Sequence, residues 1–221
     1  MVLRGAQILV ILAGMAAAMP ATLFGQGEHA RRAGSELLVL LGDIDRLQRM
    51  DPDVQQARGL HDRIAGMLSG LPLLLRLADQ ETERVNTASD IQRLRSLLVD
   101  RQWALLAEAV AALSSLYPLQ SNTFLTQVSP VRLRSALHHH QSLCAACHDF
   151  PHQQSERPPF NLYQQAKQLP KVEFTARMLV GIRGDVMSGL GNPFTDEEIA
   201  ALIALYLNAQ SSAEADLRLA E

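Results

Sequence analysis

Three residues in the second half of the chain have the types and spacing that attach a heme. Cys144 and Cys147 are separated by two residues and His148 follows directly, so the segment reads C-x-x-C-H, the signature of c-type heme attachment. Each thiol can form a thioether with one heme vinyl group, and the histidine then supplies an axial ligand to the iron. The chain has only two cysteines, and the motif uses both. We therefore expect one covalently attached heme c.

Two other kinds of site also use a C-x-x-C pair. A thioredoxin-like redox pair is typical of a βαβ pattern, and no strand alternation surrounds this motif. A zinc site would need further ligands, and the cluster His138, His139 and His140 lies close enough upstream to supply one. The zinc alternative stays open, while the export segment and the downstream pattern favour heme.

Residues 1–27 resemble a secretory signal peptide. Arg4 precedes an apolar stretch over 8–18, and Ala16 and Ala18 form an A-x-A cleavage pattern. Counted over 6–24, however, the apolar stretch reaches a length that could span a membrane, so an uncleaved anchor is the alternative. Both alternatives place the rest of the chain outside the cytoplasm, and we expect a periplasmic protein, where bacteria attach c-type heme.

Charge and motifs exclude several classes of function. The formal net charge of −3 argues against a nucleic-acid partner, for which a basic patch is expected. The chain has no nucleophile elbow, phosphate-binding loop or H-E-x-x-H pattern. We expect an electron-transfer protein with redox partner proteins in the periplasm, and no enzyme unless as a subunit of a larger oxidoreductase.

The expected fold class is all-α, an N-terminal antiparallel helical bundle followed by a smaller heme-binding domain. Apolar periodicity predicts one helix capped by Ser35, a second from Val54 that is interrupted at Gly70 and Pro72, and a third running from residue 87 or 89 to Leu116. Charged residues of this half are expected on solvated faces. The predicted divisions are 1–27 signal or anchor, 28–118 bundle, 119–129 linker, 130–210 heme domain and 211–221 tail.

The bundle half offers no predicted site. Its two histidines, His29 and His61, are interpreted as surface or capping residues. Trp103 is expected to pack at the boundary of an element. We favour docking of a redox partner as the role of this half.

Residues 130–210 resemble a class I cytochrome c in four features that occur in the family's order. These are a helix over 131–145, the C-x-x-C-H motif, a loop Arg157-Pro158-Pro159-Phe160 like the family's G-P-x-L loop, and a last helix with a capping box at Thr195 and Glu198. The resemblance implies that the Pro158 carbonyl accepts the Nδ1 hydrogen of His148. Arginine stands where the family usually has glycine. It also implies that the last helix crosses the first, with Tyr206 at a family aromatic position.

The resemblance further implies a methionine as the sixth iron ligand. Met187 lies in a turn-rich segment before the last helix and is the expected ligand. Met178 is the competitor, on a helix predicted over 173–182 where methionine usually fills the core. Histidine alternatives are the cluster 138–140, interpreted as solvent-facing or packed at the heme edge, and His152.

A His148/Met187 pair would leave no open coordination position on the iron. The thioether ligand also raises the reduction potential, and both properties suit a one-electron carrier. The alternative function is a heme-based ligand sensor or enzyme subunit with an open or exchangeable sixth position.

Overall fold

The computed structural model describes residues 26–49, 54–82, 88–150, 159–181 and 194–220, and all regular structure in these ranges is helical. The all-α expectation is thus confirmed. No helix within the described ranges is long and apolar enough to cross a membrane. The expected signal or anchor lies outside them, apart from its last two residues, 26 and 27. The helices are α1 (Glu28–Arg49), α2 (Val54–Thr82), α3 (Ala88–Val99), α4 (Trp103–Leu116), α5 (Pro130–His139), α6 (Ala145–His148), α7 (Leu162–Gln168), α8 (Lys171–Val180), α9 (Asp196–Asn208) and α10 (Ser212–Ala220).

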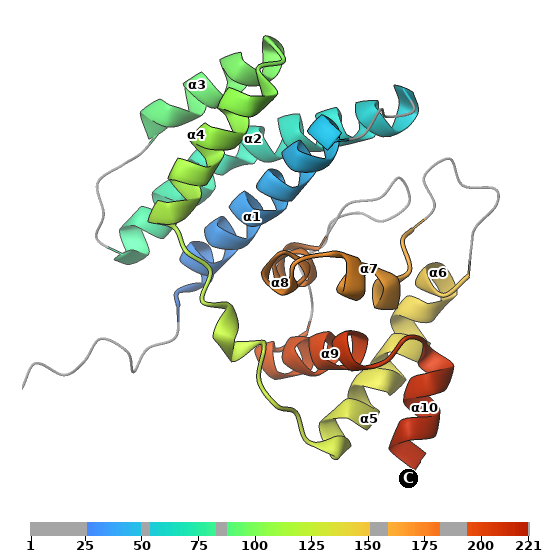
Figure 1. Cartoon of the computed structure of the whole chain (residues 1–221). Coiled ribbons are helices and arrows are strands. Elements are labelled where there is room, and N and C mark those ends of the chain that lie inside the picture. Colours follow the sequence, from blue (N-terminus) through green and yellow to red (C-terminus); the bar gives the residue numbers. More distant parts are fainter. Residues whose placement is uncertain (1–25, 50–53, 83–87, 151–158, 182–193, 221) are drawn as a thin grey trace, which may run out of the picture.

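The first four helices pack around one apolar core. Helix α1 contacts α2 and α4, and α3 contacts α2 and α4, so these helices enclose a common interior (Figure 1). The apolar stripe predicted for the first helix lies in that interior, where Leu37, Leu40 and Ile44 are buried. Trp103 begins α4 and is half-buried against the same core, as expected for a tryptophan at the boundary of an element.

The first helix begins earlier than the sequence predicts. We expected Ser35 as its N-cap, but Ser35 is buried within α1 and its hydroxyl donates to the Arg31 carbonyl at 2.9 Å. A serine inside a helix can satisfy its hydroxyl on the carbonyl four residues earlier, and it then no longer marks a helix start.

The structure differs from the prediction at one expected interruption and at one helix that was expected to be continuous. Helix α2 continues through Pro72 to Thr82, because Leu71, Leu74 and Leu75 on both sides of the proline are buried in the core and hold the helix there. The single helix predicted up to Leu116 is two helices. Arg101 separates them with φ of 54°, a left-handed conformation that ends α3 before α4 begins.

The remaining helices form a second core. Helix α9 packs against α5, α7 and α8, and α10 packs against α5, so the helix after the capping box lies beside the helix that leads into the motif (Figure 1). Helices α7 and α10 were not predicted. The largest fully buried side chains of this core are Tyr163, Phe174 and Tyr206.

The segment 119–129, predicted as a linker, is more than a connection. It contains a 3-10 turn, η2 (Ser121–Thr123), and Phe124 is buried in the second core. The chain is therefore tied to the second core before α5 begins.

The two cores meet where α1 packs against α8. At this contact the Asp43 side chain is fully buried, and it pairs with Arg63 of α2 and Arg177 of α8. Arg46 and Arg177 also pair with Glu173 of α8. The interpretation of all charges in this half as solvated is wrong for Asp43, which joins helices of both cores.

Candidate functional site

One continuous helical rod carries the C-x-x-C-H motif. It begins at Ser129, whose hydroxyl accepts the N–H of Arg132, with Pro130 in the first turn where its missing N–H costs nothing. The rod runs through α5, the turn η3 (His140–Cys144) and α6. The predicted helix leading into the motif is thus present, and it ends at His148.

The turn before the motif is a turn of π-helix. In η3 the N–H of Ala145 bonds to the carbonyl of His140, five residues earlier. A π-turn widens the helix by one residue and is frequent at functional sites. Here it changes the register between the α5 face that packs on α9 and the residues from Cys144 onward.

The two thiols differ in their surroundings. They are not joined in a disulfide; Cys144 is half-buried and Cys147 is exposed. Burial raises the pKa of the free Cys144 thiol, against the opposing effect of a hydrogen bond with Tyr206. Cys144 thus lies at the edge of the second core and Cys147 lies on the surface.

His148 is held by a backbone carbonyl. Its Nδ1 lies 2.7 Å from the carbonyl oxygen of Phe160, which precedes α7. A carbonyl can only accept, so Nδ1 carries the hydrogen, and in a neutral ring the lone pair is then on Nε2. A histidine in this state is ready to bind a metal through Nε2, and the carbonyl sets the orientation of its ring.

Sequence reasoning placed this carbonyl at Pro158. Pro158 lies outside the described residues, and the acceptor that the structure describes is two residues further along the chain.

Large apolar side chains are exposed around the motif. Leu143 precedes Cys144 and is 64% exposed, Phe150 follows two residues after His148 at 65%, and Phe160 supplies the carbonyl at 61%. Exposed apolar side chains close in sequence to two thiols, or hydrogen-bonded through their backbone to the motif histidine, suit a large apolar group bound at the motif. A heme is such a group, and these residues fit it.

The predicted histidine cluster divides into three environments. His138 is exposed, and His139 is half-buried with its ring stacked on Phe194. His140 is fully buried, where its ring nitrogens lie near the Tyr206 hydroxyl and the Asp149 carboxylate. His140 is therefore not solvent-facing, and packing at the heme edge, the other alternative for this cluster, stays a prediction for it.

Other candidate ligands are less informative. Met178 is half-buried against the second core, as expected for a core methionine. Met187 and His152 lie outside the described residues. Within the described ranges no three His, Cys, Asp or Glu side chains form a group that could hold a metal ion, so the structure gives the zinc alternative no such ligand set.

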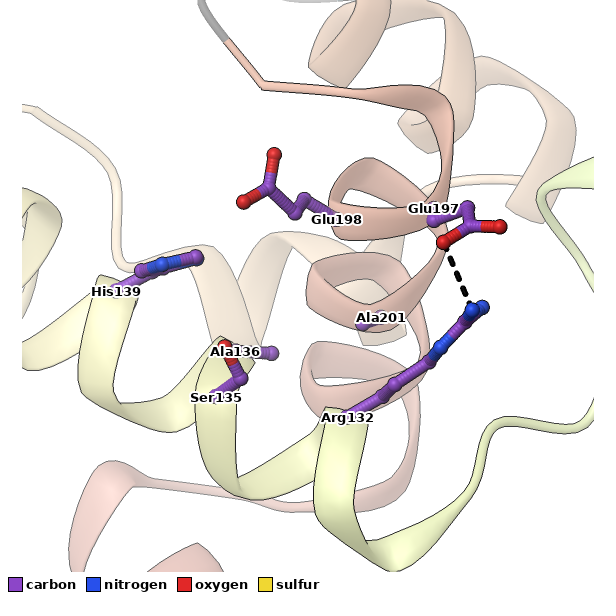
Figure 2. Close-up of a pocket in the computed structure, with 7 residues that line it drawn as sticks. All are labelled: Arg132, Ser135, Ala136, His139, Glu197, Glu198 and Ala201. Carbon is purple, nitrogen blue, oxygen red and sulfur yellow. Dashed lines mark hydrogen bonds and ion pairs between the residues drawn. The ribbon is translucent and has the colours of Figure 1, made fainter.

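A small pocket lies between α5 and α9, apart from the motif (Figure 2). Arg132 and Glu197 pair across it at 2.7 Å. Glu198 belongs to the predicted capping box, which is confirmed: its carboxylate accepts the Thr195 N–H, and Thr195 accepts the N–H of Glu198. This hydrogen bonding holds the pKa of Glu198 below its usual value. Arg132, Glu197 and Glu198 are used in these contacts, whereas Nδ1 of His139, which also lines the pocket, is buried without a hydrogen-bond partner. We assign the pocket no ligand.

Sequence reasoning missed the role of Asp149, the polar residue at the end of the motif. Asp149 follows the motif directly and accepts a hydrogen bond from the Ser212 hydroxyl at 2.7 Å, which ties α10 to the end of α6.

Sequence reasoning also missed Asp43, at the contact between the two cores. The available signal for Asp43 was its position within the apolar stripe of α1, directly before Ile44.

Comparison with known proteins gives no match to a family model, to a curated protein or to a solved structure. The functional conclusion therefore rests on the motif and the residues around it.

Proposed function

We propose that this chain is a periplasmic monoheme c-type cytochrome that carries single electrons. In this proposal heme c is attached to Cys144 and Cys147, and His148 and Met187 hold the iron. The observation that carries the proposal is the hydrogen bond from His148 Nδ1 to the Phe160 carbonyl at the end of the motif helix. This hydrogen bond leaves Nε2 of His148, the residue that follows Cys147, free to ligate the iron.

The surroundings of the motif support a large apolar cofactor. Leu143, Phe150 and Phe160 are more exposed than large apolar side chains usually are. Heme bound through the two cysteines would bury apolar surface of this kind, and the hydrophobic effect would favour that burial. The half-buried Cys144 anchors one side of the group to the second core, while Cys147 lies toward solvent.

The arrangement of helices supports a class I cytochrome domain over residues 130–210. Helix α9 begins with the capping box at Thr195 and packs against α5, and Tyr206 is buried in the core between them. These are the relations that the family resemblance implies. The helices before residue 119 would form the bundle domain of the proposed arrangement.

The chemistry follows from the proposed ligands. Heme iron with both axial positions occupied changes oxidation state by one electron without binding substrate. The residues of this chain then orient the ligands and shield the group: the Phe160 carbonyl fixes the imidazole of His148, and the second core excludes water behind Cys144. Met187 would supply the second protein ligand to the iron.

The test is expression of the full chain in a bacterium that attaches heme c in its periplasm. We expect heme that survives denaturation on the polypeptide, and a pyridine hemochrome spectrum with two saturated vinyl groups. Cys147→Ala should leave one unsaturated vinyl group or no stable heme, whereas the control Ser142→Ala on the same helix should retain normal attachment. Purified exported protein without covalent heme would refute the proposal.

A further inference from the structure

A buried histidine lies one turn before the first cysteine, and both its ring nitrogens have polar partners. Nδ1 of His140 lies 3.0 Å from the Tyr206 hydroxyl, and Nε2 lies 3.1 Å from each carboxylate oxygen of Asp149. His140 and Tyr206 are each fully buried. Burying polar groups costs free energy unless they are hydrogen-bonded. Here the hydrogen bond between His140 of η3 and Tyr206 of α9 supplies that pairing.

The partners of His140 suit both of its protonation states. An ionised Asp149 can only accept, so Nε2 carries a hydrogen in either state. A hydroxyl can donate or accept: Tyr206 donates to Nδ1 when the ring is neutral and accepts from it when the ring is charged. The change between the states needs only rotation of one O–H bond. Proton uptake therefore leaves the packing of the core intact.

The Tyr206 hydroxyl connects His140 to the motif. Burial raises the pKa of Cys144, and hydrogen bonding with Tyr206 opposes this, so the hydroxyl lies within hydrogen-bonding reach of the Cys144 sulfur. When Tyr206 accepts from a charged His140, its own hydrogen becomes available to that sulfur. A sulfur in a thioether remains a weak acceptor. The chain Asp149, His140, Tyr206 and Cys144 thus runs from the end of the motif to its first cysteine.

Charged and aromatic groups from several elements surround His140. The Asp149 carboxylate attracts a positively charged ring. It also accepts a hydrogen bond from the Ser212 hydroxyl, and its side chain is 15% exposed. The Tyr163 ring of α7 meets the His140 ring edge to face, with centroids 5.1 Å apart. The titratable groups facing His140 or its partners are Cys144 of η3, Asp149 after α6, Tyr163 of α7, Tyr206 of α9 and Asp216 of α10.

We infer that His140 takes up a proton when the heme is reduced, so that the protein carries a proton together with its electron. This inference rests on the proposed function. In reduction one electron from the donor protein enters the heme iron, and one proton from water forms an N–H bond at Nδ1. The added negative and positive charges balance, which a low-dielectric interior favours. Reoxidation returns the electron to the acceptor and the proton to water.

The coupling has a definite sign. A positive His140 stabilises the added electron, and by reciprocity the reduced heme stabilises the proton on His140. The midpoint potential must therefore fall as pH rises through the range in which His140 loses its proton. The slope of this fall corresponds to at most one proton taken up per electron.

The test is the midpoint potential of the heme-loaded full chain at several values between about pH 5 and pH 8, the range in which histidine titrates. We expect the wild-type potential to fall with pH. His140→Gln, which keeps hydrogen bonds but cannot titrate, should flatten this dependence. Tyr206→Phe should reduce it, and the control His138→Gln, exposed on the same rod, should keep the wild-type dependence.

A wild-type potential that does not change with pH, or a slope that persists in His140→Gln, would overturn the inference. Should His140→Gln not fold, nuclear magnetic resonance of the wild-type His140 ring replaces it. The ring must then titrate at higher pH in the reduced protein than in the oxidised one, and equal titration in both would overturn the inference. Because every measurement uses protein with verified covalent heme, failure of the proposed function appears earlier, as absence of that heme.

Discussion

The Arg177 guanidinium of α8 donates a hydrogen bond to the buried carboxylate of Asp43 in α1, with 2.7 Å between Nη2 and Oδ1. This bond joins helices whose apolar residues belong to different cores. Arg63 of α2 and Arg46 of α1 bond to the same carboxylate. The first four helices are therefore fastened to α8, which contributes to the same core as the helix that leads into the motif.

Replacement of Asp43 tests the strength of this connection. Asp43→Asn keeps the shape of the side chain but leaves the partly buried guanidinium groups without their carboxylate, so we expect a loss of about 3 kcal/mol in the free energy of unfolding. The measurement is urea denaturation followed by circular dichroism. The matched control is Asp45→Asn two residues away, where the carboxylate is half-exposed and pairs with exposed Arg49. We expect it to change stability by less than about 1 kcal/mol, and equal losses in the two variants would contradict the prediction.

Stability in acid follows from the same carboxylate. Burial works to raise the pKa of Asp43, but hydrogen bonds and charge from Arg63 and Arg177 outweigh it and leave this pKa below its ordinary value. A carboxyl whose pKa is lower in the folded state stabilises the fold above its unfolded pKa of about 3.9, and this contribution is lost as pH falls through the folded pKa. The stability difference between the wild type and Asp43→Asn should therefore shrink below about pH 4. A difference that stays constant from neutral pH to acid would refute this account.

The unequal thiols predict unequal reactivity in protein without heme. Because Cys147 is exposed and burial raises the pKa of the half-buried Cys144, iodoacetamide should modify Cys147 first. Chain lacking residues 1–25 and made in a reducing cytoplasm supplies the material, and mass spectrometry after short exposures gives the two rates. Tyr206→Phe removes a hydrogen bond that lowers the Cys144 pKa, so it should slow Cys144 further. Faster modification of Cys144 than of Cys147 would show that the site is arranged differently.

The proposed sixth ligand is tested with a pair of methionine variants. Met187→Ala should abolish the near-infrared methionine–iron band of the oxidised protein and allow the reduced protein to bind carbon monoxide. Met178→Ala is the control, since Met178 packs against the second core, and it should keep the band while losing some stability. Persistence of the band in Met187→Ala would assign the ligand elsewhere. An open sixth position in the wild type would instead favour the sensor alternative.

The sequence by itself determined the features that depend on short spacings. Cys144, Cys147 and His148 follow from five consecutive residues, and the capping box at Thr195 follows from four. The all-α class follows from apolar periodicity, which acts over one or two helical turns. Such patterns are local, so no knowledge of the fold was needed to find them.

Tertiary structure alone decided which polar residues lie inside. The same residue types occur on the surface, so composition did not separate the buried Asp43 from the half-exposed Asp45, or the buried His140 from the exposed His138. Their burial depends on contacts with Arg177 and Tyr206, which are 134 and 66 residues away in the chain. The acceptor for His148 was also not determined by local spacing, because Phe160 lies twelve residues further along the chain. Long-range packing therefore determined how the motif is supported, whereas local spacing determined that the motif exists.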